Sequence, residues 1–545
     1  MNKTLRIILC LFMILSFSAC SASQASSNNS ETPSTPKQDN IVYPQADVEE
    51  LSSFYVSDKQ ERDWGTLVNM YGNETAYEAY SRYRDFSNRL LINSIERGKN
   101  EFISPLSLYY ALAILTNGAS GNTRRQLENT LGMNTEDLNN FLHDMELFYK
   151  NYDDSSYFIK ANALWFNTHH GLSLNKDFLA TINEYYGDCV AENDFGDGSG
   201  LAKSVNDWAS ENTNGAIGDL VSDNDFTELT SFIILNALAT GDKWSFPFDS
   251  ADTYYQEFTS YNGEKKLVEM MHQTVWGHWS DSLSQGFARS LYNGVMVSAI
   301  LPNEGVDVYD YLNQMKQDTF IPYAVMDTGY SDIENTADGY DCIADIHYTN
   351  LSFPKFSFER EYDISEVLKK MGLSDIFDFS TSDFSAMADG DPQLVDKLLV
   401  DQVKQKTELV VNEEEVVASA VTVVLGGLGA AGCDERQTIY HDVVFDRPFI
   451  IVLSIGSDEC LLPLFVGVVN DLGETVSNAI RIENITGKIN IRSIPSTSGE
   501  KLGTYQKGEI VYAFETKEAE GYTWYRIGEN KWVADQKGEW IKVLD

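Results

Sequence analysis

The spacing of apolar positions predicts two helices near the start of a long patterned region. Over 76–97, aromatic and aliphatic residues recur at the three- and four-residue spacing of an amphipathic helix. A second helix is predicted over 105–115, because Ser104 is a suitable N-cap and Pro105 fits the first helical position. Both patterns indicate helices that pack one face into a core.

Later runs rich in β-branched and aromatic residues predict strands. They span 158–166, 231–238, 295–301, 408–425, 442–454 and 462–469, with helical patterns between them at 202–211 and 364–371. Because helices dominate early and strands late, we expect an α+β fold. We find no internal repeat.

Composition divides the chain further. Residues 21–40 are almost all small, polar or proline and cannot offset chain entropy by burial, which predicts a flexible tether. Seven glycines punctuate short strand-like runs after residue 483, which is typical of a small all-β barrel. The predicted parts are an export signal at 1–20, the tether and an unassigned acidic segment at 21–75, the body at 76–472, a linker at 473–483 and the barrel at 484–545.

The N-terminus reads as an export signal. Lys3 and Arg6 precede the mostly apolar run 7–17, which is too short to span a bilayer. The following residues, Phe17-Ser-Ala-Cys20, resemble the bacterial lipobox, whose cysteine is lipidated after export. We therefore expect an exported protein, lipid-anchored through Cys20 at the bacterial cell surface; the alternative is an ordinary signal peptide in which Cys20 is incidental.

Charge and cysteine content exclude several classes of partner. The chain carries 82 acidic and 40 basic side chains, a formal net charge of −42, which repels phosphate backbones and argues against nucleic acid. We expect membrane contact through the lipid anchor alone. Six cysteines are too few for a disulfide scaffold, and none lies in a CxxC pair, so a structural zinc site is not expected.

Catalytic motifs are absent from the sequence, so we expect no enzyme, no cofactor and no metal. There is no GxSxG elbow, no HExxH and no Walker loop. His169 and His170 are adjacent, but neighbouring side chains point to different faces and suit a shared ligand poorly. The segment 427–432 matches GxGxxG, yet no amphipathic helix follows it, which argues against dinucleotide binding.

Many segments, in the same order, resemble the serpins, a family of serine protease inhibitors. The matching segments are 100–108, 111–123, 161–165, 235–237 with Trp244, 270–271, 301–302, 353–356, 371–373, 383–385, 411–414, 447–449 and 463–467. The resemblance covers about 76–472 and implies a serpin fold, with helices around a large central mixed sheet and an exposed reactive loop.

The resemblance also implies a mechanism. A target serine protease cleaves the loop and becomes acylated, and the freed loop inserts into the central sheet and distorts the protease. Insertion buries every second loop residue. These positions are Val416, Ala418, Ala420, Thr422 and Val424, all small or β-branched and uncharged, as a strand entering a sheet requires.

Two sites depart from the family pattern. In the hinge, formed by Glu413, Glu414, Glu415 and Val416, the family usually has Gly where this chain has Glu415, and Thr or Ser where it has Val416. The shutter and breach residues implied by the resemblance are Ser104, Ser107, Asn236, Trp244 and Gln405. Gln405 stands where the family has His, and its amide is expected to hydrogen-bond near Ser107 and Asn236.

The family register places the scissile bond between Gly429 and Ala430, which suits elastase-like or subtilisin-like pockets. The alternative is the bond from Arg436 to Gln437, and the seven extra residues would leave slack that spares the protease. Cys433 lies in the same loop, as a plain thiol or as a residue that regulates inhibition by oxidation.

The segment 484–545 resembles bacterial Src-homology-3-like domains, which often bind cell-wall peptides. It carries nine basic and nine acidic residues, so the whole charge excess lies upstream. Trp524 and Trp532 could equally belong to its core or to a binding face.

These observations lead to one leading interpretation and two others. The first is a surface-tethered, monomeric suicide inhibitor that traps a serine protease in a covalent complex, with a C-terminal part that binds the cell wall or a surface partner. The second is a non-inhibitory binding protein with a serpin fold. The third, a cell-wall enzyme, is disfavoured by the missing catalytic motifs.

Overall fold

The structure is a computed structural model. It describes residues 74–150, 157–187, 189–197, 200–212, 221–276, 278–292, 294–314, 333–336, 339–342, 346–416, 438–455, 462–473, 479–528 and 530–544. The export signal, Cys20, the tether, the GxGxxG segment, Cys433 and both candidate scissile bonds lie outside these residues, as do Ala418 and Ala420.

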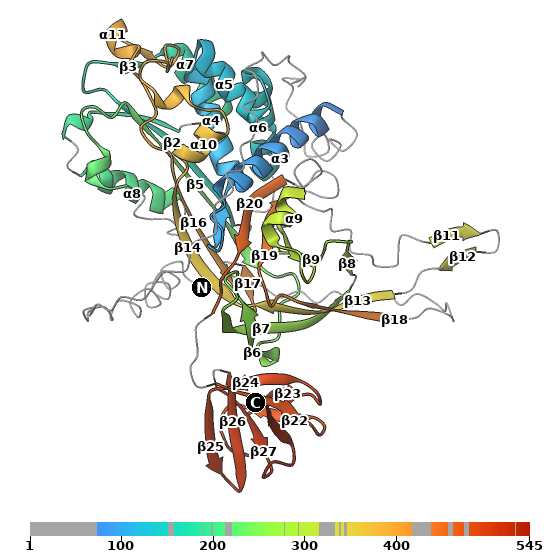
Figure 1. Ribbon diagram of the computed structural model, residues 1–545. Coiled ribbons are helices and arrows are strands. Elements are labelled where there is room, and N and C mark those ends of the chain that lie inside the picture. The colour runs from blue at the N-terminus through green and yellow to red at the C-terminus, as the bar shows by residue number, and fades with distance from the viewer. Residues whose placement is uncertain are drawn as a thin grey trace. The chain divides into compact units, whose positions relative to one another are not determined.

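Nine α-helices occur in the described residues, and four of them precede the first long strand of the body (Figure 1). They are α3 (Glu74–Ser94), α4 (Pro105–Gly118), α5 (Gly121–Leu131), α6 (Thr135–Lys150), α7 (Lys176–Tyr185), α8 (Leu201–Asn212), α9 (Val308–Gln314), α10 (Ser365–Lys370) and α11 (Pro392–Val395). The predicted N-cap is confirmed, because the Ser107 amide donates to the Ser104 hydroxyl at 3.3 Å. Every residue of α4 except Asn117 is buried, so α4 is a core helix.

Two sheet fragments flank the position that a new strand could take. One runs in the order β17 (Glu415–Val416), β5 (Phe232–Lys243), β2 (Tyr157–Asn167), β4 (Val190–Asn193). The other pairs β14 (Phe356–Asp363) antiparallel with β16 (Lys404–Val411). Within the described residues no ladder joins β16 to β5, although β17, which follows β16 in the chain, pairs with β5.

The remaining sheets of the body carry its most apolar strands. The six-stranded sheet contains β1 (Glu101–Ile103), β20 (Leu462–Val469), β19 (Phe449–Ile455), β10 (Met296–Pro302), β9 (Ser284–Ser290) and β8 (Trp279–Ser280), in that order. The four-stranded sheet contains β18 (Thr438–Val444), β13 (Ile346–Pro354), β7 (Lys265–Trp276) and β6 (Thr253–Thr259). Two short ladders join β11 (Ile333–Thr336) to β12 (Gly339–Cys342), and β15 (Ala388–Asp389) to β3 (Ser173–Leu174). Strands β19 and β20 are buried at every residue.

Most predicted elements match the structure within a few residues, but two runs that were each predicted as one strand are divided. The run 442–454 was expected to be a single strand, but β18 ends at Val444 and β19 begins at Phe449. Pro448 explains the break, because proline has no N–H to donate to a ladder. The run 408–425 is described only to Val416, and within it β16 and β17 are separate strands.

The C-terminal segment folds into strands. They are β21 (Ile480–Asn484), β22 (Ile489–Arg492), β23 (Lys501–Tyr505), β24 (Ile510–Ala513), β25 (Glu515–Ala519), β26 (Tyr522–Gly528), β27 (Lys531–Asp535) and β28 (Ile541–Leu544). They form two sheets, ordered β24-β21-β28 and β23-β22-β27-β26-β25. Among the described residues no ladder closes them into one ring, so the barrel stays a prediction.

The two tryptophans of this segment belong to its core. Trp524 is 1% exposed and Trp532 is 7% exposed, and both pack with Ala534. The Trp524 indole also has an internal partner, since its Nε1 donates to the carbonyl oxygen of Ala519 at 3.1 Å. Of the two interpretations left open by the sequence, burial favours the core.

Candidate functional site: the hinge of the reactive loop

A tight turn at Asn412 carries the chain from β16 across to β5. The Asn412 side-chain oxygen accepts from the amides of Glu414 and Glu415, each at 2.9 Å, and the Asn412 amide donates to the Glu415 carbonyl at 3.1 Å. Asparagine favours such turns because its side chain substitutes for a backbone acceptor. The turn directs β17 along the end of β5, where Glu415 pairs with Lys243.

Three hydrogen bonds hold the backbone of this hinge. The Trp244 indole Nε1 donates to the carbonyl of Asn412 at 2.9 Å, and the Trp244 amide donates to the carbonyl of Glu414 at 3.1 Å. The Phe248 amide donates to the carbonyl of Glu413 at 2.9 Å. Three consecutive carbonyls, those of Asn412 and of the hinge residues Glu413 and Glu414, therefore accept from one short segment, 244–248, which we call the breach turn; we call the three the hinge carbonyls.

Charged side chains reinforce the hinge. The Lys355 ammonium lies 3.2 Å from the Glu413 carboxylate and 3.6 Å from that of Glu269, and Lys243 lies 3.6 Å from Glu414. Burial alone would raise the pKa of Glu413, but hydrogen bonding by its own backbone and the Lys355 ammonium outweigh this and lower the pKa. Glu413 is therefore charged at neutral pH.

The first two positions of the loop alternate in burial. Val416 is 1% exposed and belongs to the main hydrophobic core, whereas Glu415 is half-buried. This alternation is what insertion of every second residue requires, because successive side chains of a strand point to opposite faces.

Gln405 ties β16 to the start of α4. Its Oε1 accepts from the Ser104 amide at 3.0 Å, and its Nε2 donates to the Ser104 carbonyl at 2.9 Å. The Ser104 hydroxyl donates to the carbonyl of Leu464 at 2.9 Å. The expectation that Gln405 would bind near Ser107 and Asn236 is thus corrected in part: its partner is the Ser104 backbone, and the side chain of Asn236 lies outside the described residues.

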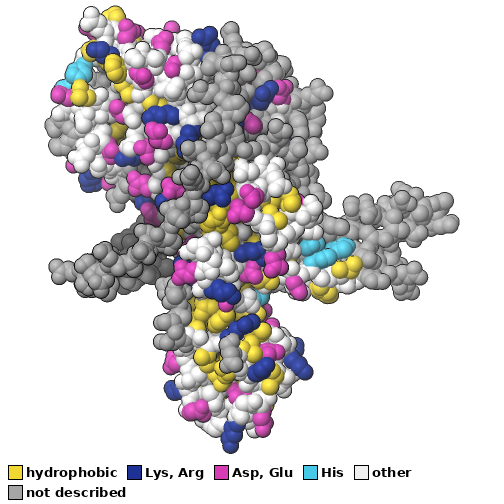
Figure 2. Space-filling view, viewed as in Figure 1, with side chains coloured by type: hydrophobic (Ala, Val, Ile, Leu, Met, Phe, Trp, Pro, Cys, Tyr) yellow, Lys and Arg dark blue, Asp and Glu magenta, His cyan; other side chains and the backbone are white. Residues whose placement is uncertain are grey.

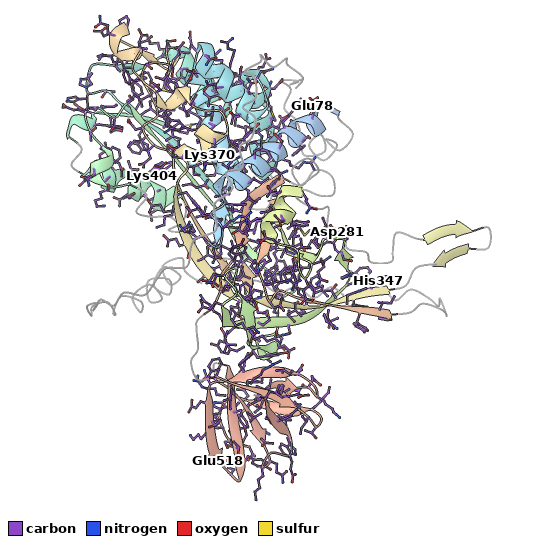
Figure 3. The ribbon with its side chains drawn as sticks, viewed as in Figure 1. Glu78, Asp281, His347, Lys370, Lys404 and Glu518 are labelled. Carbon is purple, nitrogen blue, oxygen red and sulfur yellow. The ribbon has the colours of Figure 1, made fainter. Side chains whose placement is uncertain are left out.

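The base of β16 has its own ion pair. Lys404, labelled in Figure 3 where β16 begins, lies 2.7 Å from the Asp225 carboxylate. Burial opposes ionisation of Asp225, but hydrogen bonds from Lys404 and Ser222 outweigh it and lower its pKa. The strand is therefore held at both ends by side chains from distant parts of the chain.

Three histidines meet beside β18, the strand that follows the reactive loop. Figure 2 shows a group of histidine side chains at the surface, and Figure 3 labels His347 on β13. His347 Nδ1 lies 2.9 Å from His441 Nε2, and the His278 and His441 rings stack with centroids 3.7 Å apart. A metal lies in the plane of the imidazole that binds it, so parallel stacked rings cannot share one. Accordingly, no group of three or more metal-ligating side chains suits a metal ion among the described residues.

Sequence reasoning missed part of this site. Lys355 lies in a segment used for the family resemblance and Glu413 was predicted in the hinge, but the ion pair between them was not foreseen. Phe248 and a buried arginine, Arg289, carried no signal, because an apolar residue in a loop and a lone basic residue in a strand are common surface features.

His169 lies at the surface, 2.7 Å from Asp194 and 3.3 Å from Glu228.

A profile of the family described as "Serpin (serine protease inhibitor)" matches residues 81–472, most of the chain. The chain belongs to the serpin family. Protease inhibition is the general function of that family, and its members are generally inhibitors and not catalysts. The resemblance inferred from the sequence motifs is thereby confirmed for the body.

Relatives and solved structures agree with this assignment. Human neuroserpin is 26% identical over 365 residues, which cover 65% of this chain and 82% of the relative. An uncharacterized serpin-like protein of Thermococcus kodakarensis is 27% identical over 65% of this chain and 77% of its own. The crystal structure of tengpin, a thermophilic serpin, in its native state has a TM-score of 0.60 and 28% identity, covering 72% of this chain and 94% of tengpin. The serpin fold, with its helices and large sheet, is therefore confirmed.

No helix within the described part of the chain is both long enough and apolar enough to span a membrane.

Proposed function

We propose that this serpin is a suicide inhibitor of serine proteases, tethered to the bacterial surface through Cys20. The observation that carries the proposal is the hinge: Val416 is buried beside β5, and β16 and β5 are not joined by a ladder in the described residues. A cleaved loop can lengthen β17 by pairing with the free edge of each strand. The pairing would add backbone hydrogen bonds along both strands.

In the proposed mechanism, proteolysis stops at the covalent acyl-enzyme intermediate. The protease serine Oγ attacks the carbonyl carbon of Gly429, the C–N bond breaks, and the amino group of Ala430 leaves with a proton. The new acyl bond links Gly429 to the protease. Loop insertion then carries the acylated protease away and distorts its oxyanion site before water can attack the ester.

The target class follows from the small apolar residues at the proposed scissile bond. Elastase-like and subtilisin-like pockets accept such residues, whereas trypsin requires a basic residue and would cut at Arg436. The lipid anchor would hold the inhibitor at the cell surface, and the segment 484–545 would bind cell-wall peptide or a surface partner. The assembly is a monomer apart from the protease complex.

A denaturing gel tests the trap. The purified full chain is mixed with elastase, subtilisin and trypsin, each active or blocked beforehand at its catalytic serine. The expected result is a detergent-stable band at the summed mass with active elastase or subtilisin only. Mass spectrometry should show that the released fragment begins at Ala430. Cleaved inhibitor alone, with every protease still active, would refute trapping.

The hinge itself favours a second candidate, a non-inhibitory binding protein. Glu415 and Val416 replace the small hinge residues typical of inhibitory serpins, and bulk at this point slows insertion. Under this alternative the loop is cleaved without trapping, and added loop peptide does not change the outcome. Under the proposed function, the same peptide occupies the position beside β5 and turns the inhibitor into a substrate.

A further inference from the structure

A buried arginine lies behind the breach turn. Arg289 belongs to β9 and is 8% exposed. Its guanidinium carbon lies 5.1 Å from the centre of the Trp244 ring and 4.7 Å from that of Phe248. Its Nη2 donates to the carbonyl oxygen of Phe246. One guanidinium thus contacts the first, middle and last residues of the breach turn.

This contact is made by a charge that has no counter-ion. Among the described residues no carboxylate forms an ion pair with Arg289, and its Nη1 lacks a hydrogen-bond partner. Burial lowers the pKa of Arg289 to about 10, so the side chain is still charged at neutral pH. A buried unpaired cation is unfavourable for stability, and the two aromatic rings compensate only part of that cost.

The neighbours of Arg289 indicate a structural role for this buried charge. Trp244 and Phe248 supply all three donors that bind the hinge carbonyls. Their rings meet edge to face with centroids 5.7 Å apart, and the Arg289 guanidinium faces both. A planar cation can fix two aromatic faces and a carbonyl at once, which an aliphatic side chain cannot do.

We propose that Arg289 is a positioning residue that holds the breach turn in the shape that binds the loop hinge. It acts on the hinge through Trp244 and Phe248. Without it, the turn loses its shared contact and the three hinge hydrogen bonds open more often. Its consequence for inhibition, a hinge that is released too early, rests on the proposed function.

Hydrogen exchange on the full chain tests the proposal. In Arg289→Met, the amides of Trp244 and Phe248 should exchange about tenfold faster, which is the effect of losing one typical net hydrogen-bond strength. Amides that join β10 to β19 should be unchanged. Arg289→Lys keeps the charge facing both rings and should restore part of the protection. Arg447→Met, which removes an arginine outside the breach turn, is the matched control and should leave both amides protected.

Two outcomes would overturn the proposal: unchanged protection of both amides in Arg289→Met, or an equal loss of protection throughout the body. If Arg289→Met does not fold, the Lys variant decides, because weaker protection at Trp244 and Phe248 alone supports positioning and a uniform change refutes it. A wild-type chain that traps no protease would refute the proposed function and leave this exchange measurement valid.

Discussion

The indole of Trp244 donates to the carbonyl oxygen of Asn412 at 2.9 Å, so a fully buried aromatic ring fixes the residue that lies between the end of β16 at Val411 and the hinge. The same residue binds Glu414 through its backbone. The side-chain bond can therefore be removed while the backbone bond remains.

Trp244→Phe should weaken the native state. The substitution removes the indole N–H and leaves the Asn412 carbonyl without its buried donor, a loss of about 1–3 kcal/mol in the free energy of unfolding. Urea unfolding measures this loss. Trp276→Phe, a change at a half-exposed tryptophan, should cost less than about 0.5 kcal/mol. Equal losses in the two variants would contradict the role of the indole bond.

Gln405→Leu should destabilise the region where β16 meets α4. Leucine has a similar volume but leaves the Ser104 amide without its buried acceptor, and the Ser104 carbonyl keeps only the Leu108 amide, at 3.3 Å, as a donor. We expect a loss of about 1–3 kcal/mol in unfolding free energy, from one buried backbone donor left without an acceptor. Gln405→His, the family residue, should retain part of the stability. The contradicting result would be a Leu variant as stable as the wild type.

Val416→Glu should abolish trapping without preventing cleavage. The side chain of Val416 is 1% exposed and packs in the main hydrophobic core, so a carboxylate there would be buried among apolar side chains. The stoichiometry of inhibition on denaturing gels should rise steeply toward pure substrate behaviour. Glu415→Gly is the matched variant at the half-buried neighbour, and it should inhibit at least as well as the wild type. Trapping by Val416→Glu would show that this position is not buried during insertion.

His272 should make the body sensitive to acid. Burial lowers its pKa to about 4 from 6.5, while its Nδ1 donates to the carbonyl of Asp252 at 2.8 Å. The unfolded chain binds the proton more tightly, so the stability that His272 contributes is complete above pH 6.5 and is lost as pH falls toward 4. The shift corresponds to about 3 kcal/mol.

Urea unfolding at pH 7 and pH 5 measures this effect. The wild type should lose more stability between the two values than His272→Gln, which cannot take up the proton. The exposed His170→Gln should behave as the wild type. If His272→Gln and the wild type lose the same stability, another group causes the acid sensitivity.

Local signals in the sequence were sufficient for some features of this site. The N-cap of α4 depends on Ser104 and its next few residues, and the alternation of Glu415 and Val416 follows from strand geometry alone. Both could be predicted without knowledge of the rest of the fold. The family motifs then supplied the fold of the body.

Contacts between distant segments could not be predicted. Gln405 and Ser104 are 301 positions apart, and several residues were possible partners for the Gln405 amide. Arg289 reads as a surface residue until β9 is packed behind the breach turn. The break at Pro448 was visible in the sequence, but the apolar residues on either side of it suggested one continuous strand.

The register of β17 on β5 defines where an inserted loop must end. Glu415 pairs with Lys243 and Val416 with Asp242, so each further residue toward the scissile bond meets the preceding residue of β5. Continued antiparallel pairing brings Gly426 opposite Phe232, the first residue of β5. Gly429 would then emerge just past the far end of the strand, whereas Arg436 would trail well beyond it. The length of β5 therefore determines which cleavage site leaves no slack between the inserted strand and the protease. Cleavage after Gly429 would hold the protease against the end of the sheet, whereas cleavage after Arg436 would leave it on a flexible connection.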